Sequence, residues 1–260
     1  ELKHRGIDVP LVLDARASSD APIIKEAESL GIRILFRKCI GKVEGKRKVD
    51  AVGICSVNGE GTIEELISCN AIAVSGGWTP NVNLWSHCGG KLIWDDDFGF
   101  YKPDPDNAPI DKEGETIMLP LGACAGVFSN YDIQEQVPRK INQFASRLKV
   151  KSKRYIETNI FSKDLERKAP PVFVLPHGAS RDKQKRMYID FQNDVKISDL
   201  QLAAQEGFEN VEHAKRYTTL GMATDQGKTS NINGVHVLSQ SLGKPVDKIG
   251  HTTFRPPYKP

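Results

Sequence analysis

The chain has 260 residues, of which 39% are hydrophobic and 27% charged, enough apolar material for one sizeable core or two modest ones. Its 36 basic and 33 acidic residues leave a net charge of +3, so the surface is mixed in sign and does not indicate a nucleic-acid-binding protein. No apolar run approaches the roughly 20 residues needed to cross a bilayer, and no signal-peptide pattern opens the chain. We therefore expect a globular protein of the cytoplasm with no membrane partner.

The first 70 residues predict alternating strands and helices. Residues 9–14 form a short apolar run ending in an acid, residues 22–30 have apolar positions at helical spacing, and residues 32–36 resume a strand. This order is typical of a βαβ unit with a parallel sheet. Three later segments alternate apolar and polar residues around glycine turns and predict an antiparallel meander over residues 39–43, 49–57 and 62–68.

Two glycine-rich strand ends follow in the sequence. Residues 69–81 predict an almost wholly apolar strand that breaks at Gly76 and Gly77, where the backbone can approach a ligand closely. Residues 116–126 predict a strand, a glycine turn and the start of a helix, which we expect to run from about residue 130 to 147.

The second half predicts a linker and a smaller helical unit. The charged stretch over residues 149–171 ends in Ala-Pro-Pro and is typical of a linker. A strand is predicted over residues 187–191 and helices over 198–206 and 210–220, the first with a Ser cap. Since the chain opens without methionine and stops as a new segment begins, we expect a piece of a longer protein.

Asp14 is a candidate nucleotide ligand because it ends a buried strand. A carboxylate at that place can accept a hydrogen bond from a ribose 2′-hydroxyl. The glycine-rich turn that would hold the pyrophosphate should lie about 20 residues upstream, before Glu1. A strand-ending acid without a ligand is the competing interpretation.

The stretch over residues 216–231 is the second candidate binding site. It gathers two cations, four threonines, a glutamine and two glycines after a helix, and these groups can surround a phosphate. By composition alone such a stretch is more often a solvated polar loop.

Three segments in the C-terminal third carry a specific resemblance. Residues 188–194, 211–231 and 252–258 resemble signature segments of the alpha subunit of heterotetrameric sarcosine oxidase, and residues 12–16 and 75–78 extend the similarity over the whole chain. Residues 76–81 and 121–126 also resemble a strand end and the last nucleotide-contacting turn of glutathione-reductase-like flavoproteins.

The resemblance implies an α/β fold: a glutathione-reductase-like nucleotide-binding domain with an antiparallel meander, followed by a smaller, mainly helical linker domain. The implied regions are a partial FAD/NAD(P)-type dinucleotide-binding region, a linker, a small helical FMN-contacting domain and the start of a folate-binding aminomethyltransferase-like domain, over residues 1–148, 149–171, 172–250 and 251–260.

The implied activity is the oxidative demethylation of sarcosine to glycine, with tetrahydrofolate as one-carbon acceptor. The implied partners are the beta, gamma and delta subunits, and tetrahydrofolate would bind through the aminomethyltransferase-like domain. NAD would bind this chain, FMN would be shared with beta, and FAD would lie elsewhere in the complex. We expect the chain by itself to be inactive.

The same resemblance assigns site residues. It implies NAD contacts at Gly122, Ala123, Phe128 and Asn130. It implies contacts with the FMN phosphate and ring edge at Arg216, Thr218, Gln226, Lys228 and Thr229. His213 and Lys215 could serve the flavin site too, Asp14 is a lesser nucleotide candidate, and no catalytic or metal-binding residue is predicted.

Two alternatives stay open at this point. One is a subunit of an opine-, octopine- or cyanide-forming amine dehydrogenase, which often carries a cysteine-ligated iron–sulfur cluster. The five cysteines are scattered without a CxxC pair, which argues against such a cluster and against a disulfide framework. The other alternative is a non-catalytic assembly module.

Overall fold

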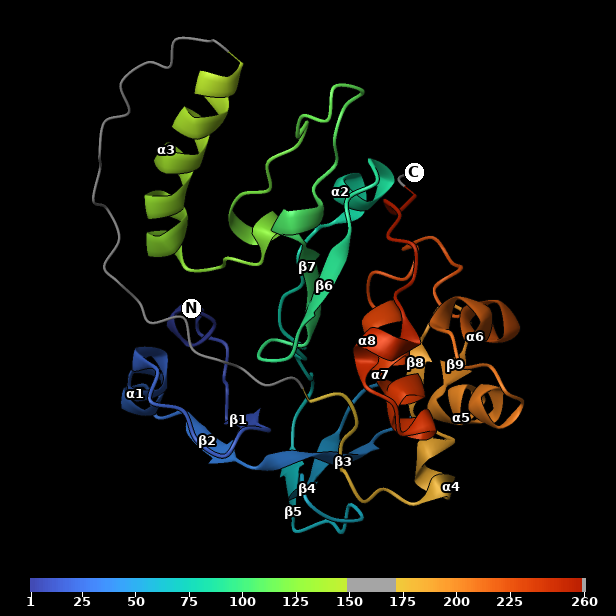
Figure 1. The fold of residues 1–260 in the computed structure, drawn as a ribbon. Coiled ribbons are helices and arrows are strands. Elements are labelled where there is room, and N and C mark those ends of the chain that lie inside the picture. The colour runs from blue at the N-terminus through green and yellow to red at the C-terminus, as the bar shows by residue number, and fades with distance from the viewer. Residues whose placement is uncertain (149–171, 259–260) are drawn as a thin grey trace. The chain divides into compact units, whose positions relative to one another are not determined.

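The computed structural model describes residues 1–148 and 172–258, which form a mixed α/β structure with small sheets (Figure 1). The chain divides into two compact units. The first comprises Glu1–Gly76 and Val172–Met187, and the second comprises Gly77–Pro171 and Tyr188–Pro260. These divisions differ from the four regions expected from the sequence, which stay predictions, and the expected linker over 149–171 lies outside the described residues.

The first unit opens with the βαβ arrangement that the sequence predicts. After a short 3-10 helix, η1 (Lys3–Arg5), strand β1 (Leu11–Asp14) pairs in parallel with β2 (Arg33–Phe36), and α1 (Pro22–Ser29) connects them. Pro22 occupies the first helical position, where its missing N–H costs no intrahelical hydrogen bond.

The antiparallel sheet of the first unit follows directly. Strands β3 (Lys38–Glu44), β4 (Ala51–Ser56) and β5 (Glu65–Ser68) pair in chain order, and β4, the central strand, is buried over residues 51–55. The core beside it contains Cys39, Cys55 and Val57, with Leu175 packed against them.

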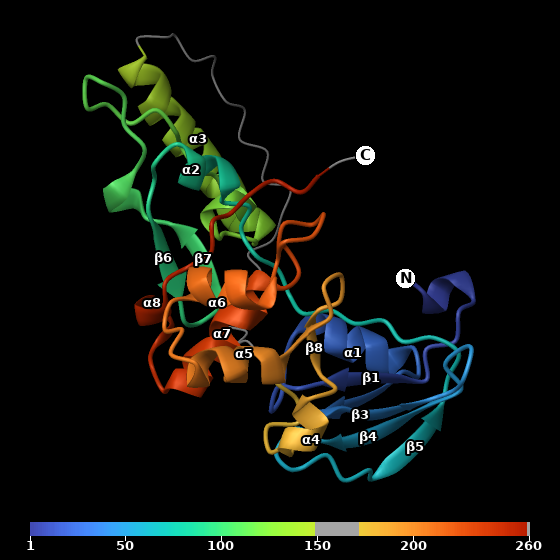
Figure 2. The ribbon, with the colours of Figure 1, turned by 90° about the vertical axis from the view of Figure 1, so that its right-hand side faces the viewer.

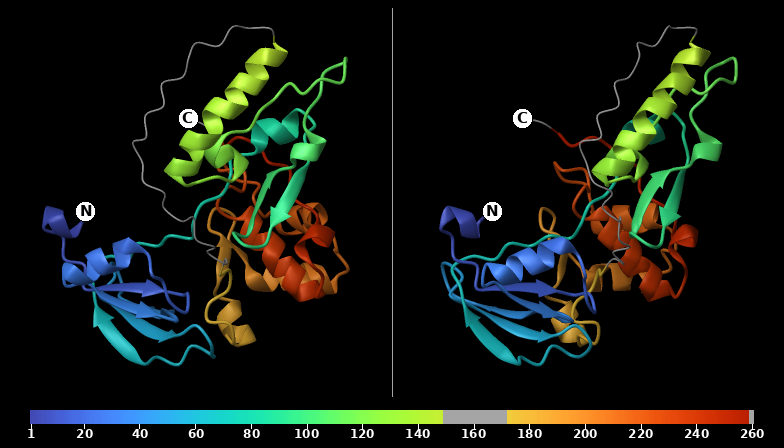
Figure 3. Two further views of the ribbon diagram at one scale, coloured as in Figure 1. Left: turned by 60° about the vertical axis from the view of Figure 1, so that its left-hand side comes forward. Right: turned by 90° about the vertical axis from the view of Figure 1, so that its left-hand side faces the viewer.

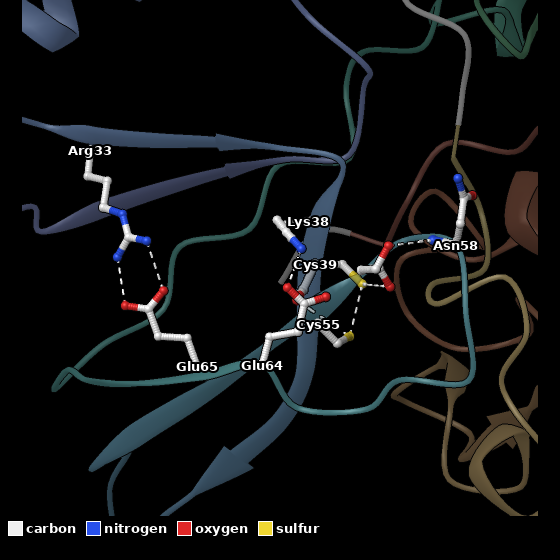
Figure 4. A network of polar contacts seen from close by, with 8 residues as sticks. Arg33, Lys38, Cys39, Cys55, Asn58, Glu64 and Glu65 are labelled. Atoms are coloured by element: carbon white, nitrogen blue, oxygen red, sulfur yellow. Dashed lines mark hydrogen bonds and ion pairs between the residues drawn. The ribbon is translucent and has the colours of Figure 1, made fainter.

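Polar contacts surround the two buried thiols of this sheet (Figure 4). Arg33 pairs with Glu65 through two hydrogen bonds of 2.7 and 2.9 Å, and Lys38 pairs with Glu64. The Sγ atoms of Cys39 and Cys55 lie 3.5 Å apart. Burial, with the hydrogen bond to Cys55, raises the pKa of the Cys39 thiol to about 12, so we assign this pair to packing.

Residues 172–187 complete the first unit. The N–H of His177 donates to the carbonyl of Val57 at 2.8 Å, and the N–H of Gly178 donates to the carbonyl of Gly59 at 2.9 Å. Helix α4 (Arg181–Gln184) follows, and Lys183 reaches the carbonyl oxygen of Gly61.

The first part of the second unit is a hairpin with helices on either side of it in the sequence. Its elements are α2 (Asn83–His87), β6 (Leu92–Asp95), β7 (Phe100–Pro103), η2 (Pro105–Asn107), η3 (Gly122–Ala125) and α3 (Asn130–Arg147). Helix α3 has the predicted bounds. Figure 3 shows it from two further sides with the coil that precedes it, and together they line an apolar cavity of about 430 Å³.

Two predicted strands do not form in this unit. Residues 69–81 are coil, with Val74 86% and Trp78 79% exposed, and residues 117–121 are coil after a single bridge between Ile110 and Thr116. A strand needs a neighbour for its backbone hydrogen bonds, and the described residues offer neither segment a ladder.

The second part of this unit is mainly helical (Figure 2). A small hairpin of β8 (Tyr188–Asp190) and β9 (Val195–Lys196) leads into α5 (Ile197–Gln205), α6 (Val211–Thr218), α7 (Asn231–Leu242) and α8 (Val246–Ile249). Their core contains the fully buried side chains Leu200, Val211, Leu220, Leu238 and Ile249. None of the helices in residues 1–148 and 172–258 has the length and apolar character to cross a membrane.

Candidate functional site

The residues predicted to contact NAD lie together at the start of α3. Gly122 opens η3 with a left-handed φ of +55° and is buried, whereas Ala123 beside it is exposed. The ring of Phe128 packs edge-on against Phe100 at 5.7 Å, and Asn130 is the first residue of α3. The turn therefore presents exposed backbone at the amino end of an 18-residue helix, where the helix dipole favours an anion.

The predicted flavin loop lies between α6 and α7 and is held from inside by Asp190. This carboxylate is 2% exposed and accepts the N–H of Gly221 at 2.8 Å and the N–H of Gln192 at 2.9 Å. The hydroxyl of Ser230, at the other end of the loop, lies 3.5 Å from the same carboxylate. Asp190 thus joins β8 to both ends of the loop.

The side chain of Asn231 fills the space inside the loop. A Cβ atom on Gly221 would lie 2.0 Å from Asn231 Oδ1, and one on Gly227 would lie 2.1 Å from Asn231 Nδ2. Both glycines have left-handed φ, +63° and +76°. The loop closes around Asn231 because these two positions carry no side chain, and Asn231 Oδ1 is buried with no hydrogen-bond partner among the described residues.

Asp225 organises the outer turn of the loop. It accepts the N–H of Gly227 at 3.0 Å, the N–H of Thr229 at 3.1 Å and the hydroxyl of Thr229 at 2.7 Å. Burial acts to raise the pKa of Asp225, but the hydrogen bonds from Thr229 and Gly227 prevail and lower it. The carboxylate therefore stays ionised and fixes Thr229.

The cations predicted for the flavin phosphate both reach the surface. The side chain of Arg216 on α6 is 63% exposed and pairs with Glu212, one turn earlier, at 3.4 Å. Lys228 is exposed in the loop, and its Nζ lies 3.4 Å from Asn81 Oδ1. Both groups are accessible to a ligand.

The remaining predicted flavin contacts make local hydrogen bonds. Thr218 ends α6 and donates to the carbonyl of Ala214 at 2.8 Å. Gln226 has a left-handed φ of +53° and donates to the carbonyl of Ala223 at 2.8 Å. The structure thus gathers Gln226, Lys228 and Thr229 in one turn and sets Arg216 and Thr218 on the preceding helix.

Asp14 belongs to the first unit. It ends β1, as predicted, and both of its carboxylate oxygens accept hydrogen bonds from the guanidinium of Arg16, at 3.0 and 2.6 Å. The hydrogen bond from Arg16 lowers the pKa of Asp14. A ribose hydroxyl at this carboxylate would share it with Arg16.

Sequence reasoning missed the residues that build the loop from inside. Asp190 lies 31 residues before Gly221, so no local pattern connects them. The glycine spacing was the available signal, because Gly221 and Gly227 surround one side chain, Asn231.

Comparison with known proteins follows from this geometry. Residues 184–260 match the family model of the Sarcosine oxidase A3 domain. The whole chain is 31% identical to sarcosine oxidase subunit alpha of Rhizobium meliloti (strain 1021), covering 24% of that protein. Over 97% of its length it is 30% identical to sarcosine oxidase subunit alpha of Corynebacterium sp. (strain P-1), covering 26%.

A solved structure, L-proline dehydrogenase from P. horikoshii, has a similar fold. The TM-score is 0.57 and the identity 20%, over 96% of this chain and 48% of that one. The chain spans about a quarter of the length of the curated relatives that it matches. By sequence, it corresponds along its whole length to a segment of the sarcosine oxidase alpha subunit, and its C-terminal part carries the A3 domain.

Proposed function

We propose that this chain is a cofactor-holding part of a sarcosine-oxidising complex of the cytoplasm. It would bind NAD at the turn before α3 and contribute the loop between α6 and α7 to an FMN site completed by a beta subunit. The complex, with gamma and delta subunits, would demethylate sarcosine to glycine and pass the one-carbon unit to tetrahydrofolate. FAD would lie outside this chain.

The proposal also assigns the regions of the chain. Residues 1–148 would be the partial glutathione-reductase-like dinucleotide-binding region, 149–171 a linker, 172–250 the FMN-contacting helical domain and 251–260 the start of the folate-binding domain. The compact pairing of residues 1–76 with 172–187 would then join the second region to the first. The similarity to sarcosine oxidase alpha subunits along the whole chain supports this assignment.

The loop around Asn231 is the observation that carries the flavin proposal. Its two glycines leave room for a backbone turn with no side chains, and its buried Asn231 Oδ1 has an unused acceptor position. Lys228 and Arg216 offer exposed cations at the loop and at the helix before it. This donor set fits a phosphate ester, since lysine supplies a point charge and arginine a two-pronged fork.

In this proposal each group has a limited role. When bound, FMN supplies the two-electron redox chemistry. Arg216 and Lys228 neutralise phosphate charge, Gln226 presents its amide to the ring edge, and Asp225 holds Thr229 in place. To donate to the phosphate, Thr229 would give up its hydrogen bond to Asp225. None of these groups acts as an acid, base or nucleophile.

The test is the FMN content of the complex assembled with the beta subunit. Replacing both cations, Arg216→Ala with Lys228→Ala, should reduce FMN content severalfold, because charged hydrogen bonds contribute about 1.5–3 kcal/mol each. Lys248→Ala is the matched control, since this exposed lysine lies on α8 outside the loop. Unchanged FMN in the double variant would show that the flavin site lies elsewhere.

A further inference from the structure

Lys215 is a buried cation on α6. It is 9% exposed, and its neighbours on the same face, Val211 and Ala214, are fully buried. Within residues 1–148 and 172–258, no hydrogen bond or ion pair joins its ammonium to another side chain or carbonyl. Burying an ammonium without an anion is costly, so proteins rarely keep one unless it has a ligand or a function.

The groups around Lys215 are mostly positive. Burial lowers its pKa, Glu212 opposes this, and the charges of Arg255 and Arg216 lower it further. The one carboxylate, Glu212, is already engaged: it accepts the N–H of Thr253 at 2.7 Å and pairs with Arg216 at 3.4 Å. Three cations therefore face one carboxylate, and the cluster has an excess of positive charge.

Arg255 reaches this cluster from the C-terminal segment. It is exposed and makes no ion pair with any residue in the described parts of the chain. The segment is held at both ends, by the contact of Thr253 with Glu212 and by the N–H of Tyr258, which donates to the carbonyl of Thr224 at 2.8 Å. Helix α6, the loop and the C-terminal segment thus meet around the two cations (Figure 1).

We propose that Lys215 and Arg255 form a binding site for a phosphate group, with Lys215 as its buried cation and Arg255 as its fork. The tetrahedral anion provides the negative charge that the cluster lacks, and its oxygens match the donors of both side chains. The inference rests on the proposed function for one source of this group, the phosphate of FMN. A free phosphate is the other source.

The experiment measures the melting temperature of the chain and its binding isotherm with inorganic phosphate, against chloride at equal ionic strength. Phosphate should raise the melting temperature of the wild-type chain, since a ligand of the native state stabilises it by mass action. In Lys215→Met the affinity for phosphate should fall about tenfold or more, as expected for a lost charge-assisted hydrogen bond. Arg255→Gln should also weaken binding, and Lys248→Met should not.

A second readout separates binding from a structural role. Without phosphate, Lys215→Met should melt at a higher temperature than the wild type, because it replaces an unpartnered buried charge with an apolar side chain of similar length. A lower melting temperature would show that the ammonium has a structural partner. That result would overturn the proposal, as would a wild-type chain that melts equally in phosphate and chloride.

Two flavin arms identify the source of the phosphate. If FMN raises the melting temperature of the wild type more than phosphate does, and riboflavin has no effect, the group belongs to the flavin. If FMN and phosphate act equally, the site takes free phosphate. Loss of the phosphate response in Lys215→Met supports the site in either case, even if the Arg216 and Lys228 double variant keeps its FMN.

Discussion

Asn231 makes two glycines of the loop irreplaceable. At Gly227 the backbone has a left-handed φ of +76°, and a Cβ atom there would overlap the amide of Asn231 at 2.1 Å. Composition marked this stretch as a possible phosphate loop, but it gave no way to identify the side chain inside it. The contact between Asp190 and Gly221 was equally invisible, because it depends on how β8 packs against the loop.

Gly227→Ala should reduce the free energy of unfolding by about 2–4 kcal/mol, which combines left-handed strain with overpacking. The matched control is Gly207→Ala, whose φ is +89° and whose Cβ would meet no atom within 4 Å. The control should lose only about 1–2 kcal/mol. Urea unfolding measures both, and equal losses would mean that the contact with Asn231 is relaxed at no cost.

Helices with apolar periodicity and a cap are the elements that the sequence predicted well. Helices α3, α5 and α6 lie at or within a residue or two of their predicted bounds. Helix α7 was missed because it opens with Asn-Ile-Asn-Gly, residues of low helix propensity, and depends on packing of Val235 and Leu238. The strand predicted over residues 69–81 was wrong because an apolar run cannot reveal whether a partner strand exists.

Helix α6 has only eight residues and depends on its cap. The Oδ1 of Asn210 accepts the N–H of Glu212 at 2.9 Å, and the helix carries Lys215 and Arg216 on its last turn. Asn210→Ala should therefore lower the free energy of unfolding by about 1 kcal/mol. Asn210→Asp keeps an acceptor and should retain most of it. Chemical denaturation compares the variants, and an equal loss in both would exclude the cap as the cause.

At the scale of the whole molecule, each compact unit contains ionised carboxylates that favour the native state at neutral pH. The hydrogen bond from Arg16 lowers the pKa of Asp14 in the first unit. In the second unit, burial acts to raise the pKa of Asp225, but hydrogen bonds from the loop lower it overall. The sequence indicated neither effect, since both depend on the folded positions of the donors.

The sign of the pH dependence follows from these shifts. Both carboxyls have a lower pKa in the folded state, so their contribution is fully present above the usual Asp pKa of about 3.9 and is lost as the pH falls through the folded value. The urea midpoint should therefore drop steadily below about pH 4. Asp14→Asn combined with Asp225→Asn should flatten this acid limb. An unchanged limb would place its origin in other groups.

The unequal exposure of the cysteines has a practical consequence. Cys39 and Cys55 are shielded in the sheet, whereas Cys88 and Cys124 are exposed and Cys69 is half-buried. After Cys88→Ser and Cys69→Ser, a maleimide dye should label Cys124 selectively. Because Cys124 lies in η3, two residues after Gly122, its fluorescence would report directly on nucleotides arriving at that turn.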